Sequence, residues 1–183
     1  MQPWPHAEDP EEIKVGWRVL VRKVFTDPAG KKQEYYTKEG LDKACVAIIA
    51  LTSDNQVVIA EQFRPGPELV MQELPGGGVE AGEDLQEAVS RELHEETGYS
   101  IGTIEPLGKV YKDAYTNSAN NYFLARNCVR DSEQHTDEGE FIKVNEISID
   151  QLIDNARNAQ MTDTEAVFLA YDKLREIQKE MNT

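Results

Sequence analysis

The stretch GGGVEAGEDLQEAVSRELHEETGYS, residues Gly76–Ser100, decides the fold of this chain. It begins with three glycines and continues with the spacing of a helix. Asp84 is a good N-cap, and Glu87 three residues later completes a capping box. Gly98 suits the left-handed residue that ends many helices. The stretch therefore predicts a glycine loop followed by a helix.

Carboxylates crowd one side of this helix. Its apolar face consists of Leu85, Ala88, Val89 and Leu93. The opposite side carries Glu87, Ser90, His94 and Thr97. At about 100° per residue, Glu92 and Glu96 fall on the apolar face and Glu95 lies at its edge. Carboxylates that converge at partial burial repel one another, and a hard divalent cation removes that cost. The pattern indicates a metal site, with a solvated acidic helix as the alternative.

The spacing resembles the Nudix box, the signature of Nudix hydrolases. The glycine and charged positions of that pattern are filled by Gly77, Glu83, Arg91, Glu92, Glu95, Glu96 and Gly98. The last position usually holds an aliphatic residue and here holds Tyr99. The resemblance implies an α/β fold, a Nudix-type α/β/α sandwich with a mixed sheet. It also implies hydrolysis of a nucleoside diphosphate linked to another group, with Mg²⁺ as the cofactor or Mn²⁺ in its place.

The resemblance also implies roles for residues of the box. The expected metal ligands are Glu92, Glu96, Glu95, the carbonyl of Gly77 and Glu83. Glu83 could equally orient other groups instead of binding metal. Arg91 is expected to orient the carboxylates, and a plain i,i+4 ion pair with Glu95 is the alternative.

A general base is also required, and in related enzymes it often lies on a loop after the box. Here that loop is Asp131–Glu140, DSEQHTDEGE. Glu140 is preferred because GEFIKV resembles the corresponding family segment, and Glu138 is the second candidate. A solvated acidic loop is the alternative. His135 lies in the same loop, but nothing in the sequence positions it.

Composition and charge limit the class of protein. The 183 residues include 19 basic and 34 acidic ones, for a net charge of −15, which argues against nucleic-acid or anionic-membrane partners. Cys45 and Cys128 lie in apolar runs and are predicted to be buried free thiols. The start MQPWPHAEDPEE lacks the features of a signal peptide, and no stretch is long and apolar enough to span a membrane. A cytoplasmic location is the default expectation.

The chain divides into an N-terminal part, 1–40, and a hydrolase domain, 41–183. Residues 1–12 hold three prolines and are predicted to be a poorly ordered lead-in. Trp17–Phe25 and Gln33–Thr37 predict a hairpin or small sheet. Further strands are expected at Ala44–Leu51, Gln56–Phe63, Leu69–Leu74, Ile101–Val110, Asn121–Cys128 and Phe141–Ile147. Helices are expected at Ser148–Asn158 and Thr162–Lys179. Helices in mid-chain and at the end suggest that both faces of a mixed sheet are covered.

Two features favour nucleoside diphosphate sugars as substrates. Glu61–Pro65, EQFRP, resembles the segment before the box in ADP-ribose pyrophosphatases and related nucleotide-sugar hydrolases. Arg64 could clamp a phosphate bidentately, with a surface ion pair as the alternative. The N-terminal hairpin resembles the extra sheet with which that subgroup forms swapped homodimers. Trp17, Tyr35 or Tyr36 could then stack on a base, or simply pack in a core.

The sequence does not identify one nucleoside diphosphate sugar as the substrate. ADP-ribose enzymes usually carry a proline turn past the box, but Asp113–Asn120 contains none, so GDP-mannose or several nucleotide sugars remain candidates. Asn117 could contact the sugar or base, or be part of a plain turn. Two other functions are alternatives: pyrophosphate removal from a nucleoside triphosphate or another nucleotide, and a non-catalytic nucleotide sensor. A sensor would be expected to have lost box carboxylates.

Overall fold

The computed structural model describes residues 1–41, 43–136 and 139–181. The chain forms two compact units, Met1–Ala44 with Tyr111–Asn120, and Cys45–Val110 with Asn121–Thr183. No helix in the described part of the chain has the length and apolar content needed to cross a membrane.

The larger unit is built on one sheet. Its elements are β4 (Cys45–Thr52), β5 (Val57–Arg64), β6 (Leu69–Glu73), β7 (Gly76–Gly78), α1 (Leu85–Thr97), β8 (Tyr99–Ser100), β9 (Thr103–Val110), β10 (Asn120–Arg130), β11 (Lys143–Ile147), α2 (Ile149–Arg157) and α3 (Thr164–Met181). Among the described residues the sheet has eight strands, with the order β11-β5-β4-β10-β8. β6 pairs with β5, β7 with β4, and β9 with β10.

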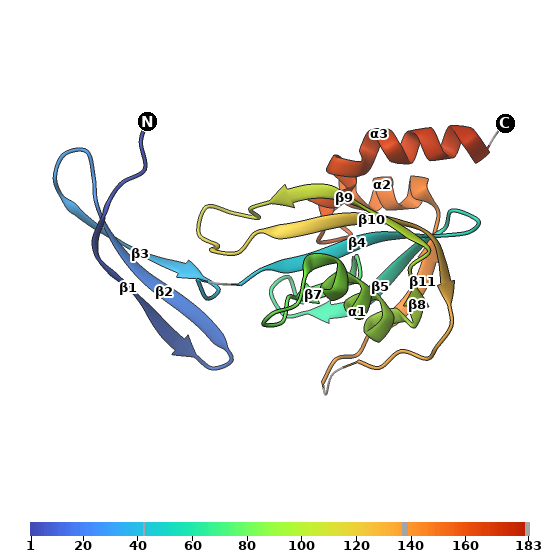
Figure 1. The fold of residues 1–183 in the computed structure, drawn as a ribbon, viewed down its shortest axis with the longest axis horizontal. Helices are drawn as coiled ribbons and strands as arrows, with labels where there is room; N and C mark the ends of the chain where they lie inside the picture. Colours follow the sequence, from blue (N-terminus) through green and yellow to red (C-terminus); the bar gives the residue numbers. More distant parts are fainter. Residues whose placement is uncertain (42, 137–138, 182–183) are drawn as a thin grey trace. The chain divides into compact units, whose positions relative to one another are not determined.

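The two faces of the sheet are covered by different helices (Figure 1). Along β4, alternate side chains point to opposite faces, as the period of a strand requires. One core cluster joins Ala47, Ile49 and Leu51 to residues of α2 and α3. The other joins Val46, Ile48 and Ala50 to residues of α1. The α/β/α sandwich predicted from the sequence is confirmed.

Several local predictions were wrong. The glycine segment is not only a loop, because Gly76–Gly78 form β7 against β4. Thr97 is buried rather than on the outer side of α1, and its hydroxyl donates to the Leu93 carbonyl. Leu85, in the first turn, is exposed instead of packed. Neither cysteine is in a disulfide within the described residues, and only Cys128 is buried.

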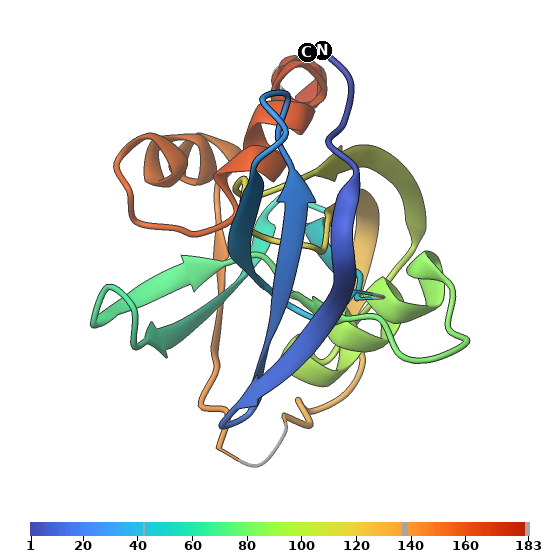
Figure 2. The same cartoon turned by 90° about the vertical axis from the view of Figure 1, so that its left-hand side faces the viewer.

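The N-terminal unit contains a three-stranded antiparallel sheet in the order β1-β2-β3 (Figure 2). The strands are β1 (His6–Val15), β2 (Arg18–Thr26) and β3 (Lys32–Lys38). The expectation that residues 1–12 lack order is therefore wrong. Glu8 accepts hydrogen bonds from Arg22 at 3.1 Å and Lys32 at 3.0 Å. Register shifts on both sides of Glu8 accommodate Pro10, as bulges in an edge strand can.

Candidate active site

The caps predicted for α1 are present and set where the helix begins and ends. The Asp84 carboxylate accepts from the backbone N–H groups of Gln86 and Glu87, and the Glu87 side chain accepts from the Asp84 N–H. Gly98 ends the helix with φ 74°, and its N–H donates to the carbonyl of His94. The caps therefore fix the rotation of the turns that carry the box carboxylates.

The glycine strand lies unusually close to its neighbours. A Cβ on Gly76 would come within 2.2 Å of the Val46 carbonyl oxygen. A Cβ on Gly77 would come within 2.5 Å of the Glu92 carboxylate. Only glycine can occupy these two positions without a shift of backbone or carboxylate, and β7 therefore lies directly against the carboxylates of α1.

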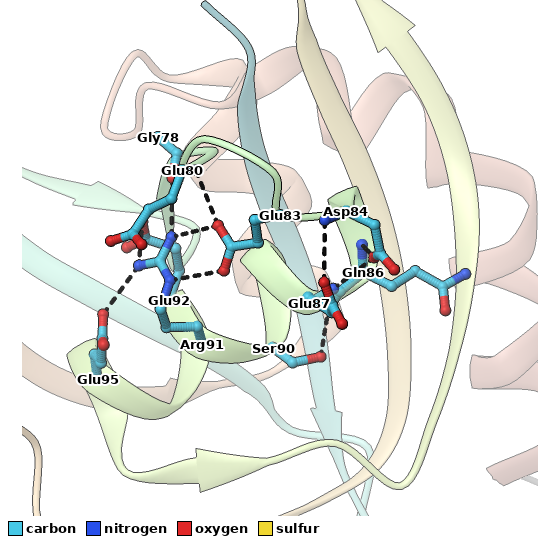
Figure 3. Close-up of polar contacts among 10 residues, drawn as sticks. All are labelled: Gly78, Glu80, Glu83, Asp84, Gln86, Glu87, Ser90, Arg91, Glu92 and Glu95. Carbon is cyan, nitrogen blue, oxygen red and sulfur yellow. Dashed lines mark hydrogen bonds and ion pairs between the residues drawn. The ribbon is translucent and has the colours of Figure 1, made fainter.

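Arg91 is the centre of the polar contacts in the site (Figure 3). Its Nε and Nη2 donate to the two oxygens of Glu83 at 2.9 and 3.0 Å. Nη1 donates to Glu92 at 3.0 Å and to Glu95 at 3.1 Å, and Nη2 also reaches the Gly78 carbonyl at 3.0 Å. All five N–H groups of the guanidinium are thereby used. The bonds to Glu83 contribute most to raising the pKa of Arg91, and they lower the pKa of Glu83.

Glu96 is buried and Glu92 is partly buried on the helix. Glu96 is only 8% exposed and accepts a hydrogen bond from the Gly76 N–H at 2.9 Å. Burial, together with the negative charges of Glu92, Glu140 and Glu73, raises the pKa of Glu96 to about 8. Burial is also the main cause of a raised pKa at Glu92. Both groups thus lie where the helical spacing placed them, on the packed side of α1.

The carboxylates suit a divalent cation by their chemistry. As the side chains stand, no group of three His, Cys, Asp or Glu residues in the described segments is gathered as a metal site. Glu92 and Glu95 are turned toward Arg91 instead. Oxygen donors are nevertheless the ligands that Mg²⁺ prefers, and a cation would offset the burial cost that raises the pKa of Glu92 and Glu96. The donor set therefore fits such an ion.

A cleft of about 200 Å³ opens beside these groups. Its walls are Gly76, Gly77, Gly78, Arg91, Glu92, Glu95, Glu96, His135, Thr136 and Glu140. Glu140, the preferred candidate for the general base, therefore shares a cleft with the box carboxylates. The second candidate, Glu138, lies outside the described residues.

The segment that follows β10 is bound to the end of α1. The Gly98 carbonyl accepts from the N–H groups of Asp131 and Ser132 at 3.0 and 3.3 Å. The Ser132 hydroxyl lies 3.3 Å from Nε2 of His94. The N–H of His135 donates to the Glu95 carbonyl at 2.7 Å. The sequence offered no position for His135, but the free carbonyls at the end of a helix were a signal that a later segment could bind there.

Arg64 makes an ion pair within the protein, the contact given as the alternative to phosphate binding. Its guanidinium forms a two-pronged ion pair with Glu73, with Nε 2.5 Å from Oε1. Glu73 is buried and also accepts from Gln62 at 3.3 Å. The pair with Glu73 is the main cause of the raised pKa of Arg64, and Glu96 contributes through its charge. The sequence analysis did not identify Glu73 as the partner of Arg64. In the sheet, Glu73 on β6 pairs with Ala60 on β5, four residues before Arg64.

The other two predicted substrate contacts belong to the N-terminal unit. Trp17 lies in the turn between β1 and β2 and is 80% exposed, with the Arg18 guanidinium 4.2 Å from its ring centroid. Core packing is thereby excluded for Trp17. The Asn117 amide donates to the Glu39 carbonyl at 2.7 Å and accepts from Lys23 at 2.5 Å. Asn117 thus holds its loop against the strands of that unit.

The same unit contains a pocket of about 430 Å³. It is lined by Pro3, Trp4, Lys23, Phe25, Tyr35, Thr37, Ala114, Tyr115, Thr116 and Asn117. The centroid of the Tyr35 ring lies 6.1 Å from that of Phe25 and 6.5 Å from that of Tyr115. Aromatic walls with a few polar groups are typical of sites for small organic molecules.

We compared the chain with protein-family models and with known proteins. The NUDIX domain family model matches residues 42–169. An ADP-ribose pyrophosphatase of Bacillus subtilis is 28% identical over 134 residues, which cover 72% of both chains. A methanol dehydrogenase activator of Bacillus methanolicus is 30% identical over 137 residues, or 73% of this chain and 74% of the relative.

A solved structure supports the fold independently. It is described as that of an ADP compounds hydrolase, and it superposes with a TM-score of 0.81 over 96% of both chains. The two sequences are 19% identical, so this likeness concerns the fold alone.

Proposed function

We propose that this chain, which belongs to the Nudix family and is a hydrolase of pyrophosphate bonds, acts on nucleoside diphosphate sugars. The products are a nucleoside monophosphate and a sugar phosphate, with ADP-ribose and GDP-mannose as the leading substrates. The observation that carries the proposal is the set of box carboxylates beside one cleft, with Glu83, Glu92 and Glu95 held by Arg91 and Glu96 held by the Gly76 N–H. The ADP-ribose pyrophosphatase relative supports the choice of substrate class.

The box residues would bind the cofactor. Glu92, Glu96 and Glu95, with the Gly77 carbonyl, are the proposed ligands of Mg²⁺ or Mn²⁺. When bound, such an ion neutralises charge on the phosphoryl oxygens and lowers the pKa of water. Glu83 has both oxygens on Arg91, which favours a role in holding the guanidinium over direct ligation.

Glu140 is proposed as the general base. It lines the cleft, and its negative charge reaches Glu92 and Glu96, whose pKa values it helps to raise. In the proposed step, the oxygen of water bonds to one phosphorus while the bridging P–O bond breaks. Glu140 takes the proton from the water, and the leaving phosphate carries the electron pair of the broken bond.

Substrate recognition is assigned to three predicted residues. Arg64, fixed by a buried carboxylate, would meet a phosphate. Trp17 is exposed as a stacking residue must be, and Asn117 borders the aromatic pocket of the N-terminal unit. A homodimer through the N-terminal strands is part of the proposal, and exposed Val15 and Tyr36 provide apolar surface for it.

Product analysis tests the proposal. Purified protein with Mg²⁺ is offered ADP-ribose, GDP-mannose, UDP-glucose and a nucleoside triphosphate in parallel, with Glu96→Gln as the inactive control and Mn²⁺ or EDTA in separate arms. Monophosphate and sugar phosphate from the sugars support the proposal and rank the substrates. Cleavage of the triphosphate alone would favour the triphosphatase alternative. Nucleotide binding without cleavage would favour the sensor.

A further inference from the structure

His135 is held at the cleft by the backbone rather than by its side chain. Its N–H donates to the Glu95 carbonyl at 2.7 Å, in the last turn of α1. Two more backbone bonds to the Gly98 carbonyl fix the start of the same segment. The residue lines the cleft together with Glu96 and Glu140. The backbone therefore holds His135 at the edge of the cleft, where the residue is exposed.

The other side-chain donors of this cleft are already used. All five N–H groups of Arg91 have acceptors in the protein. The Thr136 hydroxyl donates to the Glu140 carbonyl at 3.2 Å. Within the described residues, by contrast, the imidazole of His135 has no hydrogen bond or ion pair. Among the described residues of this cleft, His135 therefore has a side-chain donor that no protein acceptor uses, beside four carboxylates.

A diphosphate presents only acceptors. Four carboxylates, those of Glu92, Glu95, Glu96 and Glu140, line the cleft and would repel its oxygens. Metal charge would offset part of this repulsion, but each further oxygen still needs a donor. A neutral imidazole offers one N–H and a charged one offers two, so the donor exists in either protonation state.

We propose that His135 is a substrate-binding residue that donates a hydrogen bond from its imidazole to a non-bridging oxygen of the diphosphate. This inference rests on the proposed function and deepens it. The contact forms with the substrate and persists in the transition state, so it contributes mainly to binding.

Steady-state kinetics of three full-length variants test the contact with ADP-ribose and Mg²⁺. His135→Ala removes the donor, and His135→Asn keeps an N–H donor. Glu133→Gln is the matched control, because Glu133 lies in the same segment with its side chain 91% exposed. For His135→Ala we expect KM to rise about 10- to 100-fold with kcat little changed, as for loss of a bond to a charged group. His135→Asn should recover most of the loss, and Glu133→Gln should behave as wild type.

A binding measurement gives a second readout. The chain has three histidines, so the ring proton signals can be assigned with the His135→Asn variant. Addition of a non-hydrolysable α,β-methylene analogue of ADP-ribose with Mg²⁺ should shift the signals of His135. The inference is overturned if the wild type cleaves ADP-ribose but His135→Ala keeps its KM, or if the analogue binds without moving the His135 signals. If the wild type neither cleaves nor binds any sugar nucleotide, the proposed function fails and the inference fails with it.

Discussion

Glu83 and Arg91 are joined by two parallel hydrogen bonds, 2.9 Å from Nε and 3.0 Å from Nη2. Glu83 precedes the helix and Arg91 lies within it, so the pair ties the loop to α1. Two of the three remaining N–H groups of the same guanidinium bind Glu92 and Glu95. One planar donor therefore sets the positions of three carboxylates, which a lysine ammonium cannot do in this geometry.

Arg91→Lys should lower kcat by about 100-fold, because the carboxylates lose the donor that aligns them. The measurement is hydrolysis of ADP-ribose at saturating Mg²⁺. Arg175→Lys is the control, since Arg175 makes its ion pair with Asp150, on α2. Nearly normal activity of Arg91→Lys would mean that the contact with Glu95 is only a surface ion pair.

Gly77→Ala should disable the site with little loss of helix structure. The new Cβ would lie 2.5 Å from the Glu92 carboxylate and push it away. Activity is expected to fall about 100-fold, with more Mg²⁺ needed for half-maximal rate. Gly78→Ala is the matched control, because a Cβ there meets nothing within 4 Å. Equal activity of the two variants would contradict the close approach of β7 to α1.

The stability of the metal-free protein should depend on the ionisation of Glu96. Its pKa rises from 4.5 to about 8 on folding, because burial disfavours the charged form. Between these values the folded state binds more protons than the unfolded state, so the free energy of unfolding falls as pH increases.

Glu96→Gln should therefore be more stable than the wild type at pH above about 8 in EDTA, by about 5 kcal/mol. The difference should vanish near pH 4, and Mg²⁺ should reduce it at high pH by stabilising the ionised wild type. Urea unfolding at several pH values measures it. A difference that is independent of pH would show that Glu96 keeps an ordinary pKa.

What the sequence could predict is what local spacing determines. The caps at Asp84 and Gly98 and the burial of Glu96 follow from helical periodicity, and the structure contains them. The contact of Arg64 with Glu73 depends on how β5 pairs with β6, and the bond from His135 to Glu95 depends on where the chain returns after β10. Neither of these two contacts can be predicted from a local sequence pattern. The strand β1 was missed for a related reason, since Glu8 meets Arg22 and Lys32 only after the sheet has formed.

Gly98→Ala tests the attachment of the segment that carries His135. Gly98 has φ 74°, and a Cβ there would lie 2.3 Å from the Ser132 carbonyl oxygen. The variant therefore has both a strained backbone and a clash with the segment. Gly82→Ala is the matched control for strain alone, because Gly82 has φ 87° and a Cβ there would meet nothing within 4 Å.

Gly82→Ala should lower the free energy of unfolding by about 1 kcal/mol, and Gly98→Ala by about 2–4 kcal/mol. Urea unfolding gives both values, and KM for ADP-ribose should rise in Gly98→Ala because His135 moves with Ser132. If both variants lost the same free energy of unfolding and KM were unchanged, the segment would move aside without cost. Its bonds to α1 would then not position His135.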